Sequence, residues 1–138
     1  MFGRKKHKNL QPWLDYFTML QEYEARGFLD VQKEKREAYV TEPALHSLSG
    51  ESDISKKDRS LAMLLLARAV PRTVRRIRAY AAWRSGKGDA YLAEPFALHV
   101  VGDEYPHNPK YTIIVTSRRR WWMPWTVTDH VEVVEYTE

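Results

Sequence analysis

The spacing of the apolar residues changes at two neighbouring glycines, Gly86 and Gly88. Before them, apolar side chains recur every three or four residues in the segments 12–26 and 70–81, which is the period of an α-helix, and 61–70 is apolar almost all round. After them, most apolar side chains follow the two-residue alternation of β-strands. The sequence therefore predicts an α+β fold, with the main helices first and an antiparallel sheet last.

The predicted order is an N-terminal helix, a short hairpin, a long kinked helix and a three-stranded antiparallel meander packed on the helices. The expected ranges are 12–26 for the first helix, 28–31 and 38–41 for the hairpin strands, 56–85 for the long helix, and 91–101, 111–122 and 126–136 for the meander. Gly27 should end the first helix, because glycine takes the left-handed conformation cheaply. Pro43 should close the hairpin, 46–55 should be a surface loop, and Pro71 should kink or restart the long helix.

Two stripes are the best candidates for the core. Val74 and Ile77 lie on one face of the long helix at helical spacing. In the middle strand of the meander, Tyr111, Ile113 and Val115 share one face. We expect these two faces to pack against each other.

The predicted element order resembles that of NTF2-like and cystatin-like domains. This resemblance implies a cavity between the sheet and the long helix, suited to binding or hydrolysing a small molecule. A second resemblance covers 20–41, where a helix and a charged hairpin are similar to the recognition helix and wing of winged-helix proteins. That similarity implies nucleic-acid binding, but too few residues precede it for the usual topology.

The chain is 138 residues long, which suits a single domain at 10–138 preceded by a basic tail at 1–9. It has no cysteine, so disulfides and thiolate chemistry are excluded. Its longest apolar run, 61–67, is far shorter than the roughly 20 residues that cross a bilayer. We therefore expect a cytoplasmic protein with no membrane span.

Positive charge is concentrated in the middle of the chain. Residues 56–87 hold ten bases and one acid, whereas 10–55 and 88–138 carry net charges of −5 and −4. Four arginines of the long helix fall opposite its apolar stripe: Arg68, Arg72, Arg75 and Arg76. This arginine face could bind phosphates, or it could form ion pairs with acids of the protein itself.

A second cationic and aromatic group lies near the last turn. Arg118, Arg120 and Trp122 are expected on the outer face of the sheet, with Trp125 in the turn. Exposed tryptophans beside arginines are typical of protein interfaces and also suit nucleic-acid bases. We expect protein contact to be the more common use of this combination.

No group of residues points to catalysis or to a cofactor. His99, Asp103 and His107 match no established metal site in their spacing. The pairs Glu94 with His99 and Asp129 with His130 contain an acid and a base, but neither has a required third partner. We therefore expect no metal, no cofactor and no enzymatic activity.

An internal similarity relates 35–43 to 87–95, since both contain Ala-Tyr followed by Glu-Pro. It is compatible with a duplicated helix and strand, and equally with chance.

The leading hypothesis is a non-catalytic interaction or assembly protein that uses the arginine face and the tryptophan turn, with a foreign partner or a second copy of itself. The alternatives are a nucleic-acid-binding accessory protein and an NTF2-like domain that binds or hydrolyses a small molecule.

Overall fold

The computed structural model describes residues 11–50, 59–102, 109–120 and 122–136, without the side chains of 59–68, 119–120 and 124–126. The basic tail at 1–9 lies outside this part of the chain. The elements in chain order are α2 (Gln11–Ala25), β1 (Leu29–Gln32), the 3-10 helix η1 (Lys33–Lys35), β2 (Glu37–Thr41), α3 (Glu42–Leu48), α4 (Arg59–Ser85), α5 (Asp89–Leu92), β3 (Phe96–Val101), β4 (Tyr111–Arg120) and β5 (Met123–Glu135). This is an α+β fold, as predicted.

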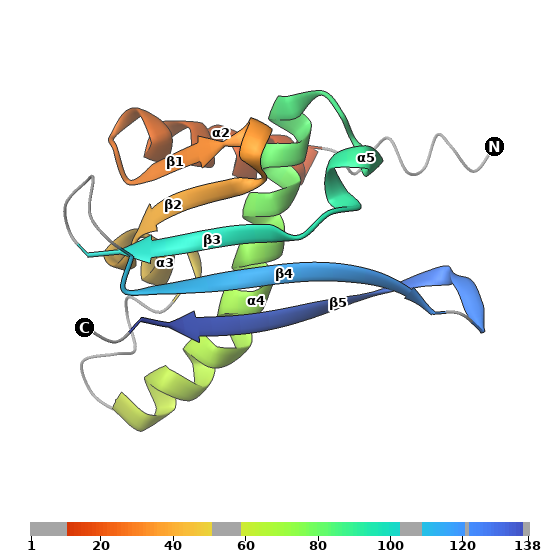
Figure 1. The fold of residues 1–138 in the computed structure, drawn as a ribbon. Helices are drawn as coiled ribbons and strands as arrows, with labels where there is room; N and C mark the ends of the chain where they lie inside the picture. Colours follow the sequence, from red (N-terminus) through yellow and green to blue (C-terminus); the bar gives the residue numbers. More distant parts are fainter. Residues whose placement is uncertain (1–10, 51–58, 103–108, 121, 137–138) are drawn as a thin grey trace.

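The sheet has five strands in the order β1-β2-β3-β4-β5. The predicted antiparallel meander is present as β3-β4-β5, but it is part of this larger sheet, which also contains the two hairpin strands. All neighbours are antiparallel except β2 and β3, which pair in parallel with Glu37 beside Ala97. Parallel neighbours need a crossover, and α3, α4 and α5 supply it (Figure 1). The hairpin thus extends the main sheet, because the outer edge of β2 hydrogen-bonds with β3.

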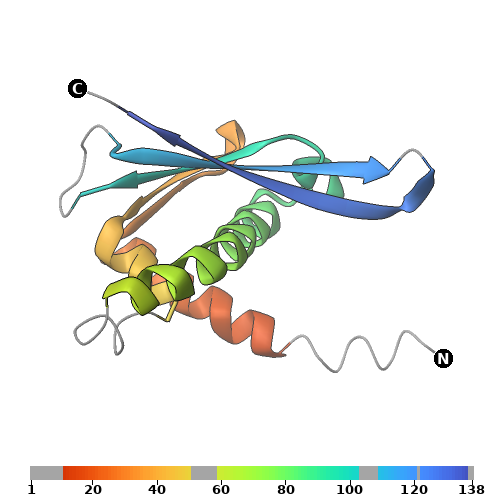
Figure 2. The same ribbon diagram turned by 90° about the horizontal axis from the view of Figure 1, so that it is seen from below.

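This pairing also removes the wing of the winged-helix resemblance. A wing projects from its domain, whereas β1 and β2 are two strands of the central sheet. The helices α2, α3 and α4 lie together on one face of that sheet (Figure 2).

Two prolines, Pro43 and Pro95, mark places where the predicted boundaries differ from the structure. Pro43 lies in the first turn of α3, where the missing N–H costs nothing, so α3 occupies the start of the predicted loop. Pro71 lies inside α4, which continues through it without a restart. Pro95 separates the helix α5 from β3, so residues 91–95 of the predicted strand at 91–101 are helical or irregular.

The internal similarity is not a structural repeat. The first copy forms the strand β2, whereas the matching Asp89–Leu92 forms the helix α5. In the sheet, Glu37 lies beside Ala97, not beside the Asp89 that the similarity matches to it.

Gly27 ends α2 as predicted. Its φ is +81°, and the N–H of Phe28 donates to the carbonyl of Tyr23 at 3.0 Å while that of Gly27 donates to Glu24 at 3.1 Å. This is the Schellman arrangement, which satisfies the last carbonyls of the helix.

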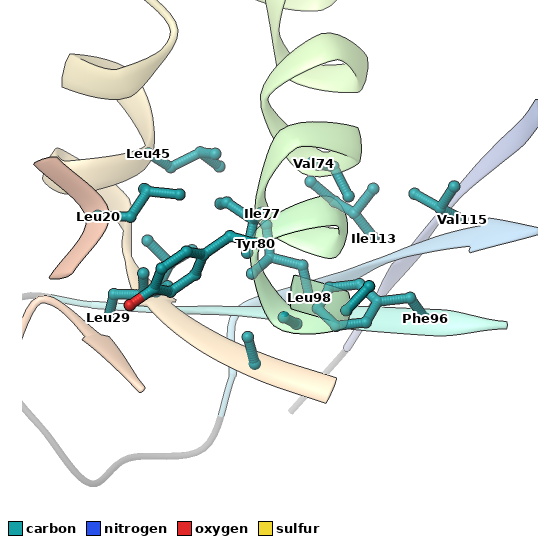
Figure 3. Close-up of a cluster of buried hydrophobic side chains, with 14 of the residues drawn as sticks. Leu20, Leu29, Leu45, Val74, Ile77, Tyr80, Phe96, Leu98, Ile113 and Val115 are labelled. Atoms are coloured by element: carbon teal, nitrogen blue, oxygen red, sulfur yellow. The ribbon is translucent and has the colours of Figure 1, made fainter. Parts of the chain in front are cut away.

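The core lies between the sheet and the helices (Figure 3). Val74 and Ile77 of α4 are fully buried, and they face Ile113 and Val115 of β4, which are 1% and 0% exposed. The predicted core faces of the long helix and the middle strand are therefore confirmed. None of the described helices is long and apolar enough to cross a membrane.

Candidate functional site

The arginines of α4 do not form one continuous basic face. Arg75 Nε lies 3.7 Å from Asp129 Oδ2, and an Arg78 terminal nitrogen lies 3.3 Å from Asp129 Oδ1. Arg84 pairs with Glu24 of α2 at 2.5 Å, and the hydroxyl of Tyr80 also donates to that carboxylate. Three arginines of α4 therefore contact acids from the two acidic flanks of the sequence.

Two other arginines of α4 point elsewhere. The Arg76 guanidinium lies 5.0 Å from the ring centre of Tyr16 in α2, a cation–π geometry. Arg72, one turn before it, is exposed and has no ion pair among the described residues. The side chain of Arg68 lies outside the described part of the chain.

Two tryptophans are half-exposed where α2 packs on α4. Trp13 is 45% exposed and Trp83 is 50% exposed. Both rings contact Phe17 between them, with centroid distances of 5.9 and 5.2 Å. Residues 72, 76 and 83 follow one another at helical spacing, so they lie along one face of α4. We call this surface the α2–α4 seam: Trp13, Tyr16, Arg72, Arg76 and Trp83.

The seam contains a shallow groove of about 220 Å³, lined by Pro12, Trp13, Tyr16 and Arg76. Burial raises the pKa of Tyr16 above its ordinary value, although Arg76 acts in the opposite direction. Tyr16 is therefore neutral at physiological pH, and the positive charge of Arg76 stays uncompensated by it. The sequence contained a signal for this surface, since Trp83 lies seven residues after Arg76.

The tryptophan turn is a separate surface. Trp122 is 57% exposed and Arg118 is exposed, as expected. The turn lies at the far end of the β4–β5 hairpin, which extends past the helices (Figure 2). The side chains of Arg120 and Trp125 lie outside the described part of the chain. The structure thus separates this turn from Arg72 and Arg76.

A larger cavity of about 570 Å³ lies where α4 and α5 meet the β4–β5 hairpin. We call it the hairpin pocket, and its lining residues are Arg78, Asp89, Leu92, Ala93, Ser117, Val127 and Asp129. Arg78 is only 7% exposed. Its guanidinium donates to Ser117 Oγ at 2.6 Å, and Ser117 Oγ donates to Asp129 Oδ1 at 2.6 Å.

Neither of the two acid and base pairs noted in the sequence, Glu94 with His99 and Asp129 with His130, forms a contact. His99 Nε2 lies 3.3 Å from Glu37, the residue that β2 brings beside β3, instead of pairing with Glu94. Asp129 contacts Arg78 on the helix side of the sheet. Its neighbour His130 is exposed and points to the opposite face, because successive residues of a strand alternate between the two faces.

His99 belongs to a chain of polar contacts on the helix-free face. Its Nδ1 lies 2.8 Å from the hydroxyl of Thr112, which in turn lies 2.8 Å from that of Tyr136. The order of carboxylate, imidazole and hydroxyl resembles that of a hydrolase triad. Thr112 is only 3% exposed, however, so its hydroxyl is closed to a substrate and the contacts tie the strands together.

Asp103 and His107 lie outside the described residues. Within the described ranges, no three histidine or carboxylate side chains are grouped to hold a metal ion.

Comparisons with protein-family models, with curated proteins and with solved structures found no match. The candidate surfaces must therefore be interpreted from their own geometry.

Proposed function

We propose that this protein is a non-catalytic interaction protein that binds an acidic partner protein through the α2–α4 seam. The observation that carries the proposal is the pair of half-exposed tryptophans, with Trp13 beside Arg76 at the groove and Trp83 on the same face of α4 as Arg72 and Arg76. Tryptophan and arginine are the side chains most enriched among the residues that dominate binding energy at protein interfaces.

Contacts within the protein hold several side chains of the seam. Phe17 is only 8% exposed and contacts both tryptophan rings, so it restricts their orientations. The ring of Tyr16 likewise restricts the orientation of the Arg76 guanidinium. Side chains that are already fixed lose less conformational entropy on binding, which raises the affinity available from a small contact area.

The positive charge of the seam favours an acidic partner. Arg75, Arg78 and Arg84 are paired within the protein, whereas Arg72 and Arg76 contact no described carboxylate within ion-pair distance. The sequence adds four basic residues in its first nine, directly before the helix whose first turn lines the groove. A partner with carboxylates around an apolar anchor complements this surface.

A peptide-display selection against the purified protein tests the proposal without a known partner. Wild type should enrich peptides with aspartate or glutamate flanking an aromatic or aliphatic residue. Trp83→Ser and the double variant Arg72→Glu, Arg76→Glu should lose these peptides, because they remove an anchor or invert the charge. Trp122→Ser is the matched control, since it removes an equally exposed tryptophan from the other surface and should leave enrichment unchanged.

Three outcomes contradict the proposal. Enrichment lost in Trp122→Ser but kept in Trp83→Ser would move the interface to the hairpin turn. Dimers by light scattering that disappear in Trp83→Ser would make the occupant a second copy of this chain. Salt-sensitive binding of a labelled single-stranded nucleic acid, lost in Arg72→Ala with Arg76→Ala, would make the seam a phosphate and base contact.

A further inference from the structure

β5 forms one edge of the sheet and is the longest of its five strands. It has 13 residues and pairs with β4 in an unbroken register from Glu135 to Val127. The opposite edge strand, β1, has only four residues. A long, regular edge favours pairing with another strand, because its outward N–H and C=O groups have no strand beside them. Within the described ranges, β5 is therefore the edge best suited to pairing with a second chain.

The usual protections of a sheet edge are weak on β5. Its sequence holds no lysine or arginine, and its one proline, Pro124, is the second residue of the strand. The register shift in its pairing with β4 lies beyond Val127, at Arg119/Arg120. A charge that faces the core side can also discourage a second strand. Asp129 is such a charge, but Arg78 and Arg75 lie 3.3 and 3.7 Å from it and offset it.

Two valines of β5 are exposed on the helix side of the sheet. Val127 is 53% exposed and Val133 is 55% exposed, although Val131 between them packs against the core. His130 lies three residues from each of the two exposed valines. A two-fold axis at His130 would therefore place each Val127 directly opposite the second copy's Val133 in an antiparallel pair. Pairing with a second copy thus covers both exposed valines at once.

The charges of β5 are compatible with this register. Glu132 falls opposite the second copy's Thr128, and Asp129 falls opposite its Val131, so neither acid directly faces another acid. The two Asp129 side chains are diagonal neighbours across the axis. Each of them is already paired with arginines of its own copy, which limits their repulsion.

α4 extends past this edge of the sheet. Its N-terminal part continues beyond β5 on the helix side (Figures 1 and 2). The sequence of this part includes the apolar run 61–67. A strand added to β5 would extend the sheet over this part of the helix, so the second strand would have a helix on one face as β4 does.

We infer that this protein forms a two-fold symmetric dimer in which β5 pairs antiparallel with the β5 of a second copy, with His130 at the axis. The two five-stranded sheets then form one continuous sheet. A second copy is the occupant that the two valines favour, because it presents a valine opposite each of them. This interface is separate from the α2–α4 seam, so each copy of the dimer keeps its seam open to an acidic partner.

The mass of the protein in solution tests the dimer. Light scattering after size-exclusion chromatography should give wild type the mass of two chains at about 100 µM, which populates even dimers with micromolar dissociation constants. Val133→Lys should raise the dissociation constant at least tenfold, because it places a charge opposite Val127 and lysine disfavours edge pairing. Thr18→Lys is the matched control, since it adds the same charge to an exposed position of α2 and should leave the dimer unchanged.

The register can be tested directly, because the chain has no cysteine. His130→Cys should form a disulfide-linked dimer under mild oxidation, because opposed Cα atoms in an antiparallel pair lie about 4.5–5.5 Å apart, within reach of a disulfide. Glu132→Cys is the control, since it is exposed on the same face but its two copies would lie about 14 Å apart along the strands. It should stay unlinked.

Several results would overturn the inference. A wild-type mass of one chain would exclude the dimer, and masses above two chains would indicate an open assembly. A linked dimer from Glu132→Cys instead of His130→Cys would move the axis. Equal weakening by Val133→Lys and Thr18→Lys would assign the effect to net charge alone, and the cysteine variants decide the question if Val133→Lys unfolds. Trp83→Ser should keep the dimer, so this inference and the peptide-display result can fail independently.

Discussion

Asp129 is the counterion of a buried guanidinium, and replacing it with asparagine isolates that role at nearly constant shape. Arg78 keeps its position in the pocket wall but loses the charge that faces it. Removing one partner of a buried ion pair costs about 3–5 kcal/mol of unfolding free energy. The side chain of Asp129 is 24% exposed, and asparagine still accepts from Ser117 and Arg78, so we expect about 2 kcal/mol for Asp129→Asn.

A double-mutant cycle separates this electrostatic cost from lost packing. Arg78→Met removes the buried cation, so Asp129→Asn added to it should cost little. We expect a coupling energy of at least about 1 kcal/mol between the two substitutions. Urea unfolding at 25 °C measures all four proteins, with the m-value as the check that the unfolded state is unchanged. Effects that add within about 0.5 kcal/mol would refute the view that Asp129 stabilises the fold by balancing Arg78.

Three further predictions test the fold. Gly27→Ala should lose roughly 1 kcal/mol of unfolding free energy, because φ at this position is +81°. Gly102→Ala should lose less, because Gly102 has an ordinary φ and the nearest atom to an added Cβ is 3.9 Å away. Equal losses in urea unfolding would contradict the Schellman assignment. Ile77→Ala should lose about 3 kcal/mol from the fully buried core, and a loss below about 1 kcal/mol would show that α4 is not packed as described. Burial, with a smaller effect of Glu42, raises the pKa of Tyr111 to about 12, while the unfolded chain ionises near 10. The stabilisation that the fold gains from keeping Tyr111 neutral is therefore complete below pH 10 and is lost as pH rises to 12. Between pH 9 and 11.5, the unfolding free energy of Tyr111→Phe should therefore fall less than that of wild type.

The candidate surfaces show where reasoning from sequence stops. Helical geometry predicts that Arg68, Arg72, Arg75 and Arg76 share one face of α4, but that geometry cannot say what packs on each side of a helix. On one side of α4, Arg75 forms an ion pair with an acid of the sheet. On another side, Arg76 contacts an aromatic ring of α2. Trp13 lies in the first predicted helix at 12–26, whose apolar residues recur at helical spacing, yet its ring is 45% exposed.

Local patterns were sufficient for several features of this protein. The α+β class, the stop at Gly27, the hairpin and the buried faces of α4 and β4 follow from periodicity and from backbone preferences, which act between residues close in the chain. The parallel pairing of β2 with β3, the contact of His99 with Glu37 and the hairpin pocket join segments far apart in the sequence. These were decided only by tertiary structure, because hydrogen bonding between strand edges and the covering of a sheet by a helix depend on which surfaces meet, and no local pattern encodes that choice.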